Sequence, residues 1–200
     1  LCGGAAYTGQ MRFLLPMLLL FAAPAPAPAF AQPAALEGAA PPPAILPLRD
    51  RAAFHDRLLA DRLDTLVPAL MRREGVDMWI VVAREYLEDP VIWSMLDGTS
   101  MAARRRTILV FSDPGEGRPV ERLTVSRYGL GGMFKPAWNP DAQPDQWKAL
   151  ADLVKARNPR RIAINVSPES AFADGLTKSQ YDEMAAALGP DLTARLVPAG

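Results

Sequence analysis

The clearest pattern of apolar and polar positions is an amphipathic segment that ends at a glycine and runs directly into an apolar stretch. The spacing predicts a helix over Arg51–Glu74, bent at Pro68, with one apolar face that packs against the rest of the domain. The positions of that face are Leu59, Leu63, Leu66, Val67 and Leu70. Gly75 ends the helix, because only a residue without a Cβ adopts the left-handed cap conformation cheaply. Val76–Ala83 is too apolar and too short for a second helix, so we expect a strand buried on both faces.

A hairpin is expected next. Thr107–Ser112 and Val120–Tyr128 have strand character, and the turn chemistry of Asp113–Gly117 between them indicates an antiparallel pair. In the second of these strands, apolar residues alternate with hydroxyl-bearing ones, which is typical of an edge strand with one covered face. The covered positions would be Leu123 and Val125, and the exposed positions Thr124 and Ser126. Gly129–Pro136 then reads as an irregular loop.

Helix and strand patterns alternate in the rest of the chain. In order, they predict a short helix from Pro90 with Asp89 as its N-cap, a helix over Gln146–Arg157, a strand over Ile162–Val166, a helix from the capping box Thr177/Gln180 to Gly189, and a strand over Leu192–Val197. Strands that alternate with helices after an initial hairpin predict an α/β domain with a mixed β-sheet and helices on both faces.

The first 47 residues have a different composition. Residues 1–10 form an upstream extension, and residues 11–31 have the early arginine, apolar run and small-residue end of a signal peptide cleaved before Gln32. The alternative, an uncleaved membrane anchor, is less favoured because prolines alternate with alanines over residues 24–28. Residues 32–47 are a Pro/Ala-rich linker, and residues 48–200 are the folded domain. The product is therefore expected to be periplasmic or secreted, without membrane attachment after cleavage.

Charge and cysteine content exclude several classes of function. The chain has 22 Lys and Arg residues against 22 Asp and Glu residues, so no net field attracts nucleic acid or an anionic membrane. Arg104–Arg106 and Arg160–Arg161 each precede an apolar strand, and solvated strand-entry charges explain them better than a phosphate-binding patch does. The single cysteine, Cys2, lies before the signal peptide. A chain that begins at Gln32 therefore has no thiol chemistry, disulfide or cysteine-bound zinc.

Residues suited to hydrolytic chemistry are few. His55 is the only histidine and lies on the first helix beside Asp56, where a solvated surface position is favoured over a metal ligand. No histidine or carboxylate stands at a spacing that would complete a metal site around it. The chain also contains no Gly-x-Ser-x-Gly nucleophile elbow. We therefore assign no catalytic, cofactor-binding or metal-ligating residue to this chain.

The block Arg62-Leu63-Asp64, Leu70-Met71 and Gly75–Val82 resembles the opening of the N-terminal domain of the creatinase/prolidase/Xaa-Pro aminopeptidase family of metallopeptidases. The later elements follow in the order that this domain uses, so the resemblance spans roughly residues 50–198. It implies a ribonuclease H-like fold and a non-catalytic role in dimerisation and active-site access. It also implies a separate "pita-bread" catalytic domain, not contained in this chain, which would hold two divalent metals and act on peptides next to proline.

The resemblance and the strand pattern point to one candidate site. Arg84, Glu85 and Tyr86 follow the carboxyl end of the first strand, where open α/β sheets place ligand crevices. The resemblance implies that they help to shape the substrate entrance, although the Tyr-Leu-Thr-Gly-Phe-like segment of many members is absent. The nearby carboxylates could bind a cation, whereas a solvated loop capped by Asp89 explains the same residues.

The tryptophans divide into two groups. Trp79 and Trp147 lie on apolar patterns and are predicted core residues. Trp93 and Trp138 are interface candidates, and packing over the sheet is the alternative for Trp138. The expected partners are the missing catalytic domain or a second copy of the chain, with a peptide substrate only in the intact protein. A stand-alone periplasmic binding or interaction module with the same fold remains the alternative function, and a complete small enzyme is the least supported.

Overall fold

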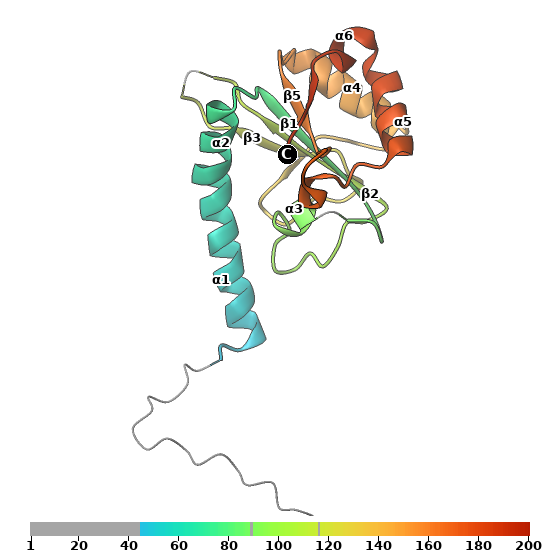
Figure 1. Ribbon diagram of the computed structural model, residues 1–200. Coiled ribbons are helices and arrows are strands. Elements are labelled where there is room, and N and C mark those ends of the chain that lie inside the picture. Colours follow the sequence, from blue (N-terminus) through green and yellow to red (C-terminus); the bar gives the residue numbers. More distant parts are fainter. Residues whose placement is uncertain (1–44, 89, 116) are drawn as a thin grey trace, which may run out of the picture. The chain divides into compact units, whose positions relative to one another are not determined.

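A computed structural model describes residues 45–88, 90–115 and 117–200 of the 200-residue chain (Figure 1). The predicted signal peptide, most of the linker and the capping role of Asp89 lie outside the described residues. Among these described residues, no helix combines the length and apolar character needed to cross a bilayer.

A six-stranded mixed sheet, in the order β4-β3-β2-β1-β5-β6, forms the centre of the domain. The strands are β1 (Met78–Arg84), β2 (Arg106–Ser112), β3 (Glu121–Thr124), β4 (Lys135–Pro136), β5 (Ile162–Ile164) and β6 (Leu196–Pro198). Strand β1 is antiparallel to β2 and parallel to β5, and β2 is antiparallel to β3. The predicted α/β class and the predicted hairpin are therefore confirmed.

Alternating side chains of the strands feed two cores, one on each face of the sheet. Met78, Ile80 and Val82 of β1 pack on the face covered by α4 (Gln146–Arg157), α5 (Lys178–Leu188) and α6 (Pro190–Thr193). Val81 and Ala83 pack on the opposite face, with the long N-terminal helical segment and α3 (Pro90–Trp93). Helices thus lie on both faces, and β1 is buried on both sides as its apolar sequence predicts.

The N-terminal helical segment contains a π turn in place of the bend predicted at Pro68. It consists of α1 (Leu48–Asp61), η1 (Arg62–Leu66) and α2 (Val67–Arg73). In η1 the Val67 N–H bonds to the Arg62 carbonyl, five residues back. Pro68 follows directly and has no N–H to continue the ordinary helical ladder, which fits a wider turn at this point.

The π turn changes which residues of this helix face the sheet. The buried positions are Leu59, Leu63, Val67, Pro68 and Met71. Leu66 and Leu70, which the helical spacing placed on the same face, are 49% and 36% exposed, so that part of the prediction is wrong. The reason is that the π turn contains an extra residue, which rotates the positions after it relative to a regular helix of 3.6 residues per turn.

The edge on the β3 side also differs from the prediction. Strand β3 ends at Thr124, and β4, from the segment predicted to be a loop, pairs outside it, so β3 is not the edge strand. Thr124 and Ser126 are buried rather than exposed. Their hydroxyls need no water, because Thr124 Oγ1 lies 2.9 Å from Ser126 Oγ, which also accepts the Ile108 N–H at 3.2 Å.

The C-terminal elements are shorter than predicted. Residues predicted to begin the last strand form α6 instead, because Gly189 supplies a positive φ and Pro190 begins a helical turn without losing a needed donor. Strand β5 ends at Ile164, before the predicted Val166. The side chain of buried Asn165 then continues the ladder by accepting the Val82 N–H and donating to the Val82 carbonyl, both at 2.9 Å.

Acid stability is expected to depend on two aspartates that tie strand ends to arginines. The pKa of Asp77 is lowered: burial alone would raise it, but hydrogen bonds from Arg160 and Arg161 outweigh that effect. The pKa of Asp113 is lowered mainly by the hydrogen bond from Arg72, against the effect of burial. These contacts also identify Arg160 and Arg161 as the strand-entry charges that the sequence predicts.

A carboxylate whose pKa is lowered by folding stabilises the folded state at pH values above its unfolded pKa of about 3.9. This contribution is lost as the pH falls through the pKa of the folded state. We therefore expect the free energy of unfolding of residues 45–200, measured by urea titration, to fall steadily between about pH 5 and pH 3. Asp77→Asn should flatten this dependence, whereas Asp141→Asn, on an exposed loop, should leave it unchanged. An unaltered slope for Asp77→Asn would contradict the prediction.

Candidate functional site

A tight turn at the carboxyl end of β1 positions the residues that the sequence singled out. Arg84 and Leu87 form an isolated bridge around Glu85 and Tyr86. The Glu85 N–H donates to the Arg105 carbonyl at 2.8 Å, and Glu85 Oε2 accepts the Arg105 N–H at 3.0 Å. Tyr86 has φ of 66° and Arg105 has φ of 51°. Left-handed backbone at two non-glycine residues costs roughly 1 kcal/mol each and is found preferentially at functional sites.

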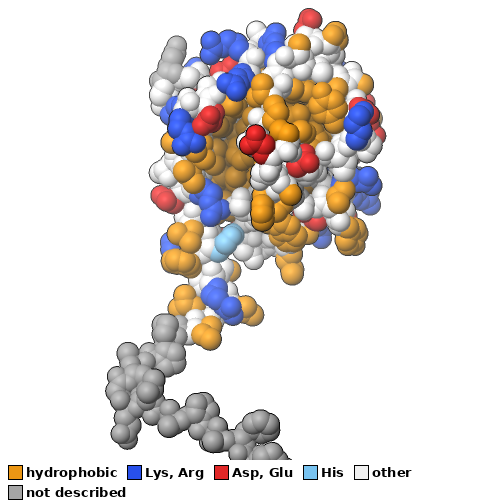
Figure 2. Space-filling view, viewed as in Figure 1, with side chains coloured by type: hydrophobic (Ala, Val, Ile, Leu, Met, Phe, Trp, Pro, Cys, Tyr) orange, Lys and Arg blue, Asp and Glu red, His pale blue; other side chains and the backbone are white. Residues whose placement is uncertain are grey.

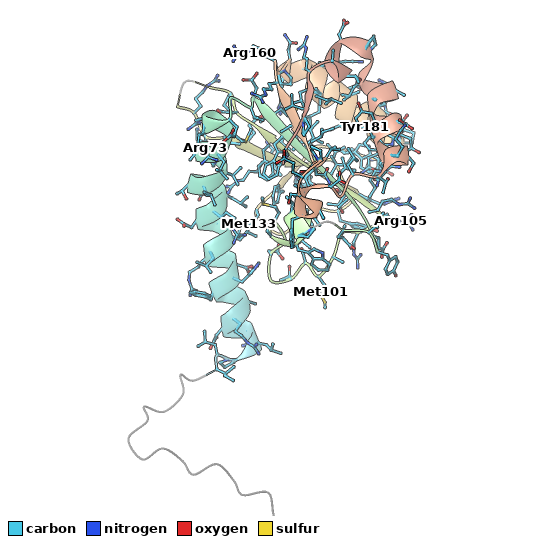
Figure 3. All side chains as sticks on the ribbon, in the orientation of Figure 1. Arg73, Met101, Arg105, Met133, Arg160 and Tyr181 are labelled. Carbon is cyan, nitrogen blue, oxygen red and sulfur yellow. The ribbon has the colours of Figure 1, made fainter. Side chains whose placement is uncertain are left out.

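A cavity of about 490 Å³ lies beside this turn, and we call it the strand-end cavity. Its walls come from the β1 turn, from the loop before β2 and from the residues after β3. The lining residues include Glu85, Met101, Arg104, Thr107, Ser126, Tyr128 and Leu130. Figure 3 shows Met101 on the loop between α3 and β2, and Arg105 at the outer end of β2.

The hydroxyl groups of this cavity are hydrogen-bonded by the protein, whereas its two charged side chains form no ion pair with any described residue. Thr107 Oγ1 accepts the Arg104 N–H at 3.0 Å, and Ser126 Oγ accepts the Ile108 N–H. The Arg104 guanidinium lies 5.4 Å from the centre of the Tyr128 ring. Within the described part of the chain, no ion pair joins Arg104 to Glu85 or to another carboxylate. The cavity is thus lined by one guanidinium, which lies over Tyr128, and one carboxylate, which accepts the Arg105 N–H, and neither has an ion-pair partner within the described residues.

The structure separates the residues of the predicted site. Glu85 lines the strand-end cavity, whereas Tyr86 is 93% exposed and points away from the core. Arg84 is exposed and lies directly opposite Arg106 across the β1–β2 ladder. Arg106 bonds to Glu183 at 2.9 Å and lies 4.3 Å from the centre of the Trp147 ring, and Trp147 is buried as predicted.

The other two candidate aromatics lie elsewhere. Trp93 ends α3, is 49% exposed, and lies near η2 (Ala171–Ala173), where Phe172 is also exposed. Trp138 is half-buried against the core on the α4 side, and its Nε1 donates to the Gln143 carbonyl at 2.6 Å. Of the two roles left open for Trp138, packing over the sheet is the one for which the structure provides contacts.

A second surface, which the sequence did not reveal, runs along the N-terminal helical segment. Phe54, Leu58, Leu66 and Leu70 are spaced four or eight residues apart, and each leaves between about a third and a half of its surface exposed. We call these four residues the exposed stripe. Leu58, Leu66 and Leu70 directly precede the buried residues Leu59, Val67 and Met71. The helix therefore carries an apolar band of which the sheet covers only half. Figure 2 shows hydrophobic side chains exposed along α1.

The exposed stripe leads into a groove of about 430 Å³ between α2 and the end of the described chain, which we call the α2 groove. Leu70 belongs to both, and the other apolar lining residues are Met71, Val76, Trp79, Ala163, Pro198 and Ala199. Arg73, labelled in Figure 3, lies at its rim. Trp79, predicted to be a core residue, stacks on Phe111 with 5.2 Å between ring centres and packs against the core, although it is only partly buried. It also lines the groove.

The described residues contain no group of three or more His, Cys, Asp or Glu side chains arranged to hold a metal. His55 is about half exposed, and its Nδ1 lies 3.5 Å from Asp56 Oδ1. The two candidate sites of this domain are the strand-end cavity and the exposed stripe with the α2 groove.

Comparisons of the chain with protein-family models, with curated proteins and with solved structures find no match. The resemblance to the creatinase-type N-terminal domain consequently depends on its residues and on the order of its elements alone.

Proposed function

We propose that this chain is the non-catalytic N-terminal domain of an exported Xaa-Pro-peptidase-like metallopeptidase. It acts by docking, through the exposed stripe and the α2 groove, against a catalytic domain or a second copy of itself. The observation that carries the proposal is the half-covered apolar band on the long helix, which continues into the groove at Leu70. Export follows from the signal-peptide pattern of residues 11–31.

The strand order supports the ribonuclease H-like part of the resemblance. Strands β1, β2 and β3 form an antiparallel meander, and β5 and β6 extend the sheet on the far side of β1 in parallel. Helices pack against both faces, and on the face of the N-terminal helical segment the α2 groove lies beside β5. This arrangement leaves one apolar region for a neighbouring domain.

The energetics favour a docking role for this surface. Scattered exposed leucines are ordinary in a monomer, whereas a contiguous apolar stripe beside an apolar groove is typical of an interaction site. Completing the burial of each half-exposed side chain would contribute roughly 1 kcal/mol. Four such residues and the groove offer several kcal/mol, which is enough to hold a domain that is already tethered and does not lose full translational freedom.

The proposal predicts a specific loss of association. Residues 45–200 are mixed with a separately produced pita-bread catalytic domain, and sedimentation velocity follows both hetero- and self-association. The double variant Leu58→Ser/Leu66→Ser should weaken association at least about tenfold, because it removes two half-exposed apolar contacts. Each substitution should change the free energy of unfolding by no more than about 1 kcal/mol.

The matched control is Leu87→Ser, which alters a similarly exposed leucine outside the stripe. It should leave association unchanged. A clean monomer at high concentration that also fails to bind the catalytic domain would show that docking is not the function of this surface.

A second candidate function is a stand-alone periplasmic binding module with the same fold. The strand-end cavity favours it, because charges of both signs, neither in an ion pair with another described residue, line a concave site. Failure of the docking experiment together with ligand binding at the cavity would favour this second function.

A further inference from the structure

We infer that the strand-end cavity binds a small zwitterion of the amino-acid type, that is, a molecule with one ammonium, one carboxylate and an apolar side chain. The inference does not depend on docking, since none of the residues involved belongs to the exposed stripe or the α2 groove.

The two charged side chains of the cavity select for a ligand with both charges. A simple anion would be attracted by Arg104 but repelled by Glu85. A simple cation would be attracted by Glu85 but repelled by Arg104. A zwitterion places its carboxylate on the guanidinium and its ammonium on the carboxylate. Both contacts are charge-assisted hydrogen bonds, the stronger kind.

The backbone places both charged residues at the same cavity. The Glu85 N–H bonds to the carbonyl of Arg105, the residue after Arg104, and both Glu85 and Arg104 line the cavity. One compact ligand that carries both charges can therefore meet both residues. The charged ends of a longer extended peptide lie farther apart, since each residue adds about 3.3 Å.

The remaining walls of the cavity provide an apolar surface large enough for the side chain of an amino acid. Tyr128, Met101 and Leu130 line the cavity, and Met101 is 85% exposed, an unusual position for a large apolar side chain. The cavity volume of about 490 Å³ falls in the range of small-molecule sites. A leucine-sized ligand would cover these side chains while its charged end reaches Glu85 and Arg104.

The test uses residues 45–200 and four probes: L-leucine, N-acetyl-L-leucine, L-leucinamide and trileucine. Isothermal titration and chemical-shift changes at Tyr128 and Met101 follow binding. We expect saturable binding of leucine, with N-acetylleucine (no ammonium), leucinamide (no carboxylate) and trileucine (distant charges) each at least about tenfold weaker.

Two variants assign the charges. Glu85→Gln retains an oxygen that accepts the Arg105 N–H, so the turn should persist, but the preference for leucine over N-acetylleucine should disappear. Arg104→Gln should remove the preference over leucinamide, and Arg104→Lys should restore part of it. Glu88→Gln and Arg127→Gln, outside the cavity lining, should bind leucine like the unchanged chain.

Three results would overturn the inference: no saturable binding of leucine at tens of millimolar, equal binding of the probes that lack one charge, or equal loss of binding in the control variants. Thermal unfolding of each variant shows whether a loss of binding comes from the site or from the fold.

Discussion

Replacing Asn165 with alanine is expected to lower the free energy of unfolding by roughly 2–5 kcal/mol, a large part of the total for a domain of this size. The Asn165 side chain is fully buried and forms two hydrogen bonds to Val82 in the central strand. Alanine would leave the Val82 N–H and carbonyl without partners in a dry interior, and each unsatisfied group costs about 1–3 kcal/mol. Urea unfolding of residues 45–200 measures the change.

Two comparisons isolate the cause. Asn165→Asp keeps the size and one acceptor but loses the donor to the Val82 carbonyl, so it should also destabilise strongly. Asn139→Ala, on an exposed loop where Oδ1 accepts the Asp141 N–H, should cost no more than about 1 kcal/mol. A loss below about 1 kcal/mol for Asn165→Ala would mean that the backbone re-pairs without this side chain.

Truncation of Phe111 is the second large effect that we expect. The ring is fully buried on β2, stacks on Trp79 and meets Phe134 edge-on with 5.6 Å between ring centres. Phe111→Ala should cost about 3–5 kcal/mol, because it leaves a cavity beneath the long helix and removes both aromatic contacts. Trp79 would lose its support, so its fluorescence should shift toward the exposed value.

The matched variants are Phe111→Leu and Phe172→Ala. Leucine keeps most of the volume and should cost about 1.5 kcal/mol or less. Phe172 is 71% exposed, so its truncation should cost well under 1 kcal/mol. Equal effects for Phe111→Ala and Phe172→Ala would refute the assignment of Phe111 to the core.

The features of the fold that the sequence predicts are those with local causes. The apolar run of β1, the turn chemistry before β3 and the cap at Thr177 each lie within a few residues of the structure that they produce. At Thr177 the side chain accepts the Gln180 N–H as predicted, although the Gln180 side chain bonds to the Thr177 hydroxyl rather than to its backbone.

The features that the sequence does not predict depend on distant partners. Thr124 and Ser126 are buried because their hydroxyl groups hydrogen-bond to each other. Asn165 continues the strand ladder because its side chain bonds to Val82 beside it. The strand-end cavity follows the same rule. Glu85 was identified from its place after a strand, whereas Arg104 and Tyr128 join it from segments that only the β1–β2–β3 ladder brings together. The basic run before β2 was the sole signal for Arg104.

The π turn at Arg62–Leu66 determines which way the side chains on either side of it face. In an uninterrupted α-helix, residues four apart drift around the axis by about 40° per step, so Leu59 and Met71 would not face the same way. The wider turn absorbs this drift and keeps both the buried positions and the exposed stripe parallel to the axis. Gain or loss of one residue in this segment would rotate everything before it by about 100° around the helix axis and turn the stripe away from the groove.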